Sequence, residues 1–183
     1  DVVKVAFIGV GARGNGHAKQ IAAIEGTEVV GISDLFEDLA KKSYEICNEI
    51  GNNDRHTNIA LYYGGENKWR TMLKEVQPDA VFISTNWDNH APMAIETMKN
   101  GAHAFVEVPM ATTIEDLWEI VNTSEKTRKH CMMMENVNYG RDELMYLNMC
   151  RKGVIGDFLH AEAAYIHELR FQMKEENRGT GSW

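Results

Sequence analysis

Three glycines with G-x-G-x-x-G spacing, Gly9, Gly11 and Gly14, separate an apolar run from a stretch of helical periodicity. The run, residues 2–10, is rich in β-branched side chains and indicates a strand buried on both faces. In that context the first glycine permits a tight turn, the second lets the backbone approach a pyrophosphate, and the third lets the helix pack closely. The helix N-terminus then offers unpaired N–H groups to phosphates. A glycine-rich turn of some other α/β domain stays open as the alternative for this motif alone.

A carboxylate follows the second strand-like run, residues 27–34, at the separation that a dinucleotide site requires. Asp34 lies twenty residues after Gly14, where it can accept hydrogen bonds from the adenosine ribose hydroxyls and repel a 2′-phosphate. The spacing therefore favours NAD over NADP. Two alternatives stay open: Asp34 as the N-cap of the next helix, and contact of Arg13 with a phosphate.

Strand-like runs alternate with helical patterns as far as residue 137. This alternation predicts an α/β fold, an open and mostly parallel, doubly wound sheet with helices on both faces. We expect an NAD-binding Rossmann domain over 1–137 and an incomplete second domain over 138–183. Residues 158–169 alternate in polarity and predict a strand that is exposed on one face. Without an intrachain partner, this strand should pair with another copy of the chain, giving a homo-oligomer, or be poorly ordered.

Polar residues follow three further strand-like runs, and ligands of open α/β sheets bind outside the carboxyl ends of the strands. The candidates at the carboxyl end of the run over residues 80–85 are Thr85, Asn86, Trp87 and His90. Thr85 and Asn86 can hydrogen-bond a cofactor, and Trp87 can cover it. For His90, a capping or core-edge role is an equal alternative.

The next two runs end in Glu107-Val108 and in Glu135-Asn136, with Tyr139 close behind. Four strand ends are thus expected to place polar groups around one cleft. Glu107 and Glu135 also suit structural roles, and their sequence separation alone does not support a two-carboxylate hydrolase.

Composition excludes several classes of protein. There are 27 acidic against 19 basic residues, a formal charge of −8, which argues against nucleic-acid partners and anionic membranes. The three cysteines form no CxxC pair and the histidines lack metal-ligand spacing, so no metal site is expected. No apolar run is long enough to span a membrane. The chain starts at Asp1 without Met, so removal of an upstream signal stays open, and the soluble protein is either cytoplasmic or exported to the periplasm.

The segments GVGARG, ISD, STNWDNH and EVP and the turn over residues 153–156 resemble the Gfo/Idh/MocA oxidoreductases. That resemblance implies a Rossmann domain followed by a larger, open antiparallel sheet that holds the substrate site. The typical family motif is Glu-Lys-Pro, whose Lys takes part in hydride transfer. Val108 stands in its place here, and an apolar side chain cannot shuttle a proton, which argues against ordinary sugar dehydrogenase chemistry.

Three longer segments, residues 123–141, 147–157 and 160–170, resemble the family 109 glycoside hydrolases, which also use Glu-Val-Pro. This resemblance implies an NAD-dependent α-N-acetylgalactosaminidase that removes terminal α-linked N-acetylgalactosamine from a glycoside. The implied route is transient oxidation at C3, elimination of the C1 aglycone, addition of water and re-reduction, with no net redox change. Members of that family are longer, so the resemblance also implies that this chain is an N-terminal part and is inactive by itself.

On this basis the candidate site divides into three groups. The expected cofactor contacts are Gly9, Gly11, Ala12, Arg13, Gly14, Asp34, Thr85, Asn86, Trp87, His90, Glu107, Val108 and Asn136. The catalytic candidates are Glu107 and Tyr139, and the substrate candidates are Tyr165 and His167, which share the more apolar face of the expected strand. Two other functions stay open: an NAD-dependent sugar or polyol dehydrogenase, which would form net NADH, and a non-catalytic nucleotide- or sugar-binding module.

Overall fold

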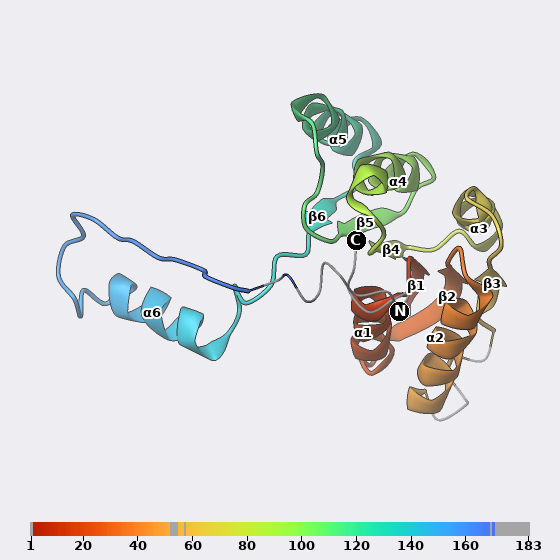
Figure 1. Ribbon diagram of the computed structural model, residues 1–183, viewed down its shortest axis with the longest axis horizontal. Helices are drawn as coiled ribbons and strands as arrows, with labels where there is room; N and C mark the ends of the chain where they lie inside the picture. Colours follow the sequence, from red (N-terminus) through yellow and green to blue (C-terminus); the bar gives the residue numbers. More distant parts are fainter. Residues whose placement is uncertain (1, 52–54, 57, 169, 171–183) are drawn as a thin grey trace.

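Six parallel strands form one sheet in the computed structural model, which describes residues 2–51, 55–56, 58–168 and 170. The order across the sheet is β3-β2-β1-β4-β5-β6 (Figure 1). The strands are β1 (Val3–Ile8), β2 (Thr27–Ser33), β3 (Ala60–Tyr62), β4 (Ala80–Ile83), β5 (His103–Val106) and β6 (Cys131–Met133). The helices are α1 (Ala12–Ala22), α2 (Glu37–Ile50), α3 (Lys68–Val76), α4 (Trp87–Lys99), α5 (Ile114–Thr127) and α6 (Arg141–Arg151). The doubly wound α/β fold is therefore confirmed.

The strand order reverses between β1 and β4, and this reversal determines where a ligand can bind. β1 pairs with β2 on one side and with β4 on the other, so that Ala6 lies between Gly31 and Val81. The chain winds outwards from β1 in both directions, and the loops after β1 and β4 leave the sheet on opposite sides. Such a switch point opens a crevice at the carboxyl ends of the strands.

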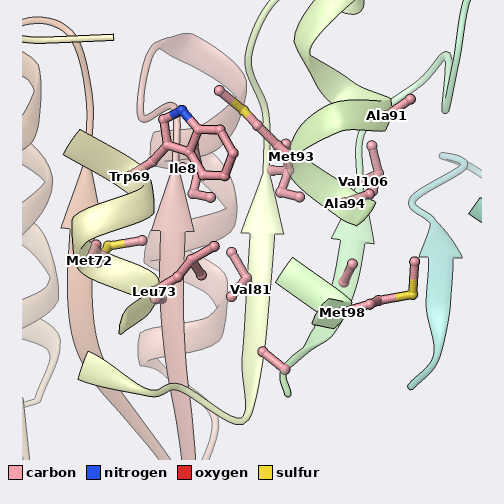
Figure 2. Close-up of a cluster of buried hydrophobic side chains, with 14 of the residues drawn as sticks. Ile8, Trp69, Met72, Leu73, Val81, Ala91, Met93, Ala94, Met98 and Val106 are labelled. Atoms are coloured by element: carbon pink, nitrogen blue, oxygen red, sulfur yellow. The ribbon is translucent and has the colours of Figure 1, made fainter. Parts of the chain in front are cut away.

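Two apolar cores cover the two faces of the sheet. On one face, α3 and α4 pack Leu73, Met93 and Met98 against Ile8 and Val81 (Figure 2). On the other face, α1 and α2 pack small buried side chains against the sheet, among them Ala18, Ala22, Ala40 and Cys47. Small residues let these two helices approach β1 and β2 closely, which brings the start of α1 to the strand ends.

The start of helix α4 determines where two of the candidate residues lie. In the structure Asn86 is the N-cap, Trp87 is the first helical residue, and Pro92 lies inside the helix. Trp87 and His90 therefore belong to the first turn of α4.

The strand expected over residues 158–169 is absent from the described residues. Residues 158–168 form no sheet ladder and are exposed, and Leu169 lies outside the described residues. Figure 1 shows α6 and the segment after it extending away from the sheet, and α6 buries none of its residues. Because a strand needs a partner that supplies the ladder hydrogen bonds, the strand and its pairing with another copy of the chain stay predictions.

Candidate functional site

The glycine-rich turn between β1 and α1 tolerates no side chain at two of its positions. Gly9 has φ +82°, and a Cβ there would lie 2.6 Å from the carbonyl oxygen of Ser84. A Cβ on Gly14 would lie 1.9 Å from the carbonyl oxygen of Gly9. The two glycines therefore let α1 start directly against the ends of β1 and β4.

The N-terminus of α1 suits an anion. Its N-cap, Gly11, contributes no side-chain cap, and the first turn, which includes Ala12 and Arg13, contains no acidic residue. The N–H groups of this turn lack intrahelical partners, and together with the helix dipole they favour a phosphate. Behind the turn, Ser84 Oγ is buried and has no hydrogen-bond partner among the described residues. These features fit the pyrophosphate of a dinucleotide.

Asp34 lies directly after β2 and is tied to the glycine turn. Its Oδ2 accepts a hydrogen bond from the Val10 N–H at 2.8 Å, and its Oδ1 accepts one from the Phe36 N–H at 2.9 Å. Phe36, and not Asp34, is the N-cap of α2, so the capping alternative does not apply. A carboxylate oxygen has two acceptor positions, which leaves one on each oxygen for a ribose hydroxyl.

A first cavity of about 520 Å³ joins the glycine turn to Asp34 and to the end of β4. Its lining residues are Ile8, Gly9, Gly11, Ser33, Asp34, Leu35, Phe36, Leu39, Gly65, Glu66, Trp69, Ser84, Thr85, Asn86, Asn89 and Met93. Sequence reasoning identified the glycines, Asp34, Thr85 and Asn86, and it missed the contributions from β3–α3, Gly65 to Trp69. The Gly64-Gly65 pair after a short strand was the available signal.

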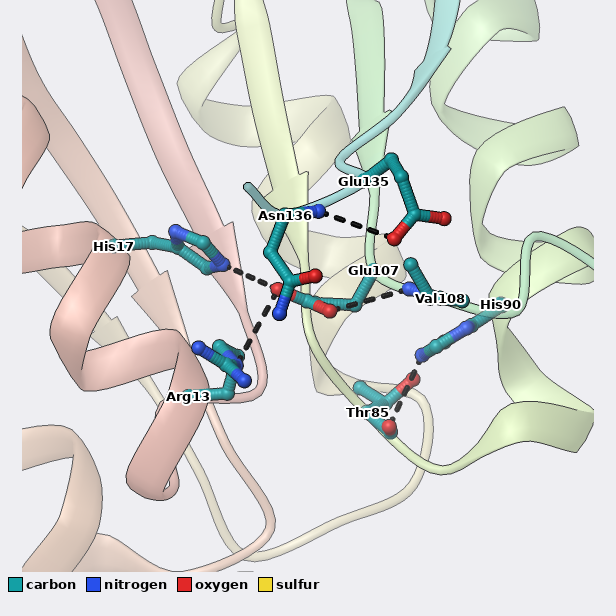
Figure 3. A network of polar contacts seen from close by, with 8 residues as sticks. All are labelled: Arg13, His17, Thr85, His90, Glu107, Val108, Glu135 and Asn136. Carbon is teal, nitrogen blue, oxygen red and sulfur yellow. Dashed lines mark hydrogen bonds and ion pairs between the residues drawn. The ribbon is translucent and has the colours of Figure 1, made fainter. Parts of the chain in front are cut away.

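His90 connects two strand ends and lines neither cavity of the described residues. The side chain is 1% exposed. Its Nε2 lies 3.0 Å from the carbonyl oxygen of Thr85 (Figure 3), and its Nδ1 lies 2.7 Å from that of Pro109. His90 thus supports the loops after β4 and β5 from behind. Trp87 is half exposed and likewise lies outside the cavity linings.

Glu107, at the end of β5, is the centre of a charged cluster. Its Oε1 lies 2.6 Å from His17 Nε2 and 3.6 Å from Arg13 Nε, and its Oε2 accepts the Val108 N–H at 3.2 Å (Figure 3). Burial opposes ionisation of this carboxyl. The hydrogen bonds from His17 and Val108 and the charges of His17 and Arg13 outweigh that effect, so the pKa of Glu107 is held below its usual value.

A second cavity, of about 430 Å³, lies between α1 and the ends of β4, β5 and β6. It is lined by Arg13, Gly16, His17, Gln20, Phe82, Phe105, Glu107, Met132, Met134, Glu135, Asn136 and Tyr139. The rings of Phe82 and Phe105 stack at 4.8 Å between centroids. Sequence reasoning missed both phenylalanines and His17, although His17 lies one helical turn after Arg13 and therefore shares its face.

The two substrate candidates are not brought to either cavity. Tyr165 and His167 lie in the segment after α6; both are exposed, and Tyr165 is 88% exposed. Their rings stack on one another at 5.7 Å between centroids. They point to the same side, but their role toward a substrate stays a prediction.

The described residues include possible metal ligands and cysteine thiols. In that part of the chain, no group of three or more His, Cys, Asp or Glu side chains is arranged to hold a metal ion. Burial raises the pKa values of the Cys47 and Cys131 thiols to about 11, which disfavours the nucleophilic thiolate. The described helices include none with the length and apolar character needed to cross a membrane.

Two family models match consecutive parts of the chain. Residues 3–135 match the oxidoreductase family with an NAD-binding Rossmann fold. Residues 139–182 match the C-terminal domain of glycosyl hydrolase 109.

Relatives and solved structures agree with these matches. Glycosyl hydrolase family 109 protein 1 of Akkermansia muciniphila is 58% identical over 100% of this chain and 37% of the relative. An α-N-acetylgalactosaminidase of Shewanella oneidensis is 51% identical over 100% of this chain and 39% of the relative. This chain thus spans less than two fifths of the length of these relatives. The scyllo-inositol dehydrogenase of Lactobacillus casei, solved with NAD(H) and scyllo-inositol, aligns with a TM-score of 0.73 at 18% identity, over 86% of this chain and 43% of its own; this likeness concerns the fold.

Proposed function

Because the chain belongs to the oxidoreductase family with an NAD-binding Rossmann fold, we propose that it is the cofactor-binding part of an NAD-dependent glycosidase. The resemblance to family 109 glycoside hydrolases is confirmed over its whole length. The substrate that we propose is a terminal α-linked N-acetylgalactosamine, in line with the name of the Shewanella oneidensis relative.

One structural observation carries the proposal. The glycine-rich turn, the Asp34 carboxylate and the Glu107 cluster lie at the strand ends around two cavities. Both cavities are lined in part by residues 9–17. Amide donors for phosphates and a carboxylate for hydroxyls are the groups that a dinucleotide with an unmodified ribose requires. The negative charge of Asp34 opposes a 2′-phosphate, which supports NAD over NADP.

When bound, NAD would supply reversible oxidation of a sugar hydroxyl. The α1 amides would bind its pyrophosphate, Asp34 would orient the adenosine ribose, and Thr85, Asn86 and Asn136 would offer further hydrogen bonds. Glu107 would act as an ionised acceptor for a hydroxyl in the second cavity. Tyr139, which lines the second cavity and is 79% exposed, would donate to the sugar.

Val108 stands where the typical motif of the oxidoreductase family has Lys. The residue is 38% exposed next to Glu107, and its side chain can neither accept nor donate a proton. A simple dehydrogenase needs a group that takes the hydroxyl proton when the product leaves oxidised. Transient oxidation at C3 in the glycosidase route releases the same hydroxyl proton, so in either route a residue other than Val108 must accept it, and the glycosidase returns a proton to that oxygen when the ketone is reduced again.

The proposal is tested by incubating the whole protein with NAD and an α-N-acetylgalactosaminide in D₂O. Cleavage with deuterium at C2 of the released sugar and no net NADH is the expected result, because oxidation at C3 acidifies the C2 proton. Cleavage without deuterium would contradict the redox route. Net NADH from free sugar without cleavage would establish the dehydrogenase alternative.

We also propose that residues 1–183 alone bind NAD and do not cleave glycosides. This chain spans 37% of the Akkermansia muciniphila relative, and the described residues place Tyr165 and His167 away from both cavities. Calorimetric titration with NAD and a glycoside assay on the same preparation test the two halves of this statement separately. Cleavage by a chain of verified mass would refute the second half.

A further inference from the structure

His17 and Glu107 meet across two elements that are ninety residues apart in the chain. His17 lies on α1 and Glu107 follows β5, and the distance between Nε2 and Oε1 is 2.6 Å. Both side chains are largely buried, with exposed fractions of 20% and 16%. A carboxylate only accepts hydrogen bonds, so the ring N–H of His17 is the donor.

The carboxylate of Glu107 is held from two sides. On one side Oε1 faces His17 and the guanidinium of Arg13, and on the other Oε2 accepts the Val108 N–H. These contacts fix the plane of the carboxylate and leave one acceptor position on Oε2 for a ligand hydroxyl. Glu135 is the other carboxylate that lines the same cavity.

We propose that His17 is a positioning residue, which orients Glu107 and keeps it in the acceptor form that a hydroxyl of the bound dinucleotide or sugar requires. The inference rests on the proposed function for the use of Glu107, but the contact itself exists without a ligand. Neither the glycine motif nor the Glu-Val-Pro segment contains His17, and the sequence analysis assigned it no role.

The physical reason is the burial of Glu107. A carboxylate that leaves water favours its neutral form unless nearby donors and positive charges compensate. A neutral carboxyl in this place would donate one hydrogen bond and lose part of its acceptor capacity. Removing the imidazole would therefore both release the carboxylate from its orientation and shift its ionisation.

The experiment compares His17→Ala and His17→Gln with Lys19→Ala as the matched control. Gln can offer an N–H where His17 has Nε2 but carries no charge, and Lys19 is an exposed residue of the same helix that lines neither cavity. The first readout is the titration of the Glu107 carboxyl by ¹³C NMR in the cofactor-free protein. The second is the dissociation constant for NAD at neutral pH, measured by calorimetry.

We expect His17→Ala to raise the Glu107 pKa, because the hydrogen bond and the charge of His17 both lower it, and to weaken NAD binding about tenfold, as for loss of a hydrogen bond to a charged group. His17→Gln should recover most of the affinity, and Lys19→Ala should match the parent protein. An unchanged Glu107 titration in His17→Ala would overturn the inference, and so would an affinity loss in His17→Gln equal to that in His17→Ala. Absence of NAD binding by the parent protein would instead contradict the proposed function, while the titration would still test the contact.

Discussion

The Asp34 carboxylate accepts a hydrogen bond from the backbone N–H of Val10, with 2.8 Å between Oδ2 and N. Val10 lies within the glycine-rich turn after β1, and Asp34 follows β2, so the bond joins two parts of the proposed cofactor site. Asp34 therefore holds the turn in shape in addition to presenting its charge. Substitutions at this position must separate the two effects.

Asp34→Ala should weaken NAD more than NADP. The ribose hydroxyls lose an ionised acceptor, a loss of about 1.5–3 kcal/mol for hydrogen bonds to charged groups, whereas NADP is relieved of charge repulsion. Asp34→Asn is the control, because its amide oxygen can still accept from the Val10 N–H. Calorimetric titration of both variants with both cofactors gives the comparison. Equal losses for NAD and NADP would mean that Asp34 acts on the turn alone.

Gly14→Ala and Gly16→Ala should have opposite effects although both lie in α1. A Cβ at Gly14 would lie 1.9 Å from the Gly9 carbonyl oxygen, whereas a Cβ at Gly16 meets no atom within 4 Å. We expect Gly14→Ala to lower the free energy of unfolding and to abolish NAD binding. Gly16→Ala should raise the free energy of unfolding by about 0.5–1 kcal/mol through helix propensity. Urea unfolding of both variants measures this, and a destabilised Gly16→Ala variant would contradict it.

Val108→Lys should impair glycoside turnover in the whole protein. A positive charge would enter the neighbourhood of Glu107, whose carboxylate it would pair with and withdraw from a ligand. Val108→Leu adds a methylene without charge and is the control. Initial rates of glycoside cleavage and of NADH formation from free sugar should be recorded together. Unchanged cleavage by Val108→Lys would remove Val108 from the site, and a gain of net NADH would favour the dehydrogenase route.

Glu107 should make the stability of the fold depend on acidic pH. Its pKa is lowered in the folded state, so its contribution is present above the unfolded value, near 4.5, and is lost as pH falls through the folded pKa. Glu107→Gln removes this contribution. The difference in free energy of unfolding between parent and variant should be larger at neutral pH than well below pH 4.5. A difference that stays constant over this range would show that the carboxylate contacts add no net stability.

The fold and the first half of the candidate site follow from local patterns in the sequence. The glycine spacing reflects steric limits within one turn, and the alternation of strand and helix periods reflects which faces are buried. Both are properties of neighbouring residues, so the parallel α/β sheet and the positions of Gly9, Gly14 and Asp34 could be predicted.

Such local patterns do not predict which residues meet when they are far apart in the sequence. Whether residues 158–168 form a strand depends on a partner strand, which the described residues do not supply. The position of His90 after β4 made it a candidate cofactor contact. In the structure its ring instead contacts the carbonyl oxygens of Thr85 and Pro109, and it supports the loops after β4 and β5.

By itself, then, the sequence determined the Rossmann architecture and the positions of the glycine turn and of Asp34 after β2, since turn sterics and hydrophobic period act within a few residues. Only the tertiary structure decided that His17 meets Glu107, that Phe82 stacks on Phe105, and that Tyr165 and His167 lie away from both cavities. These relationships depend on which strands pair and in which register. Pairing register is a property of two strands together, so it cannot be predicted from either segment alone.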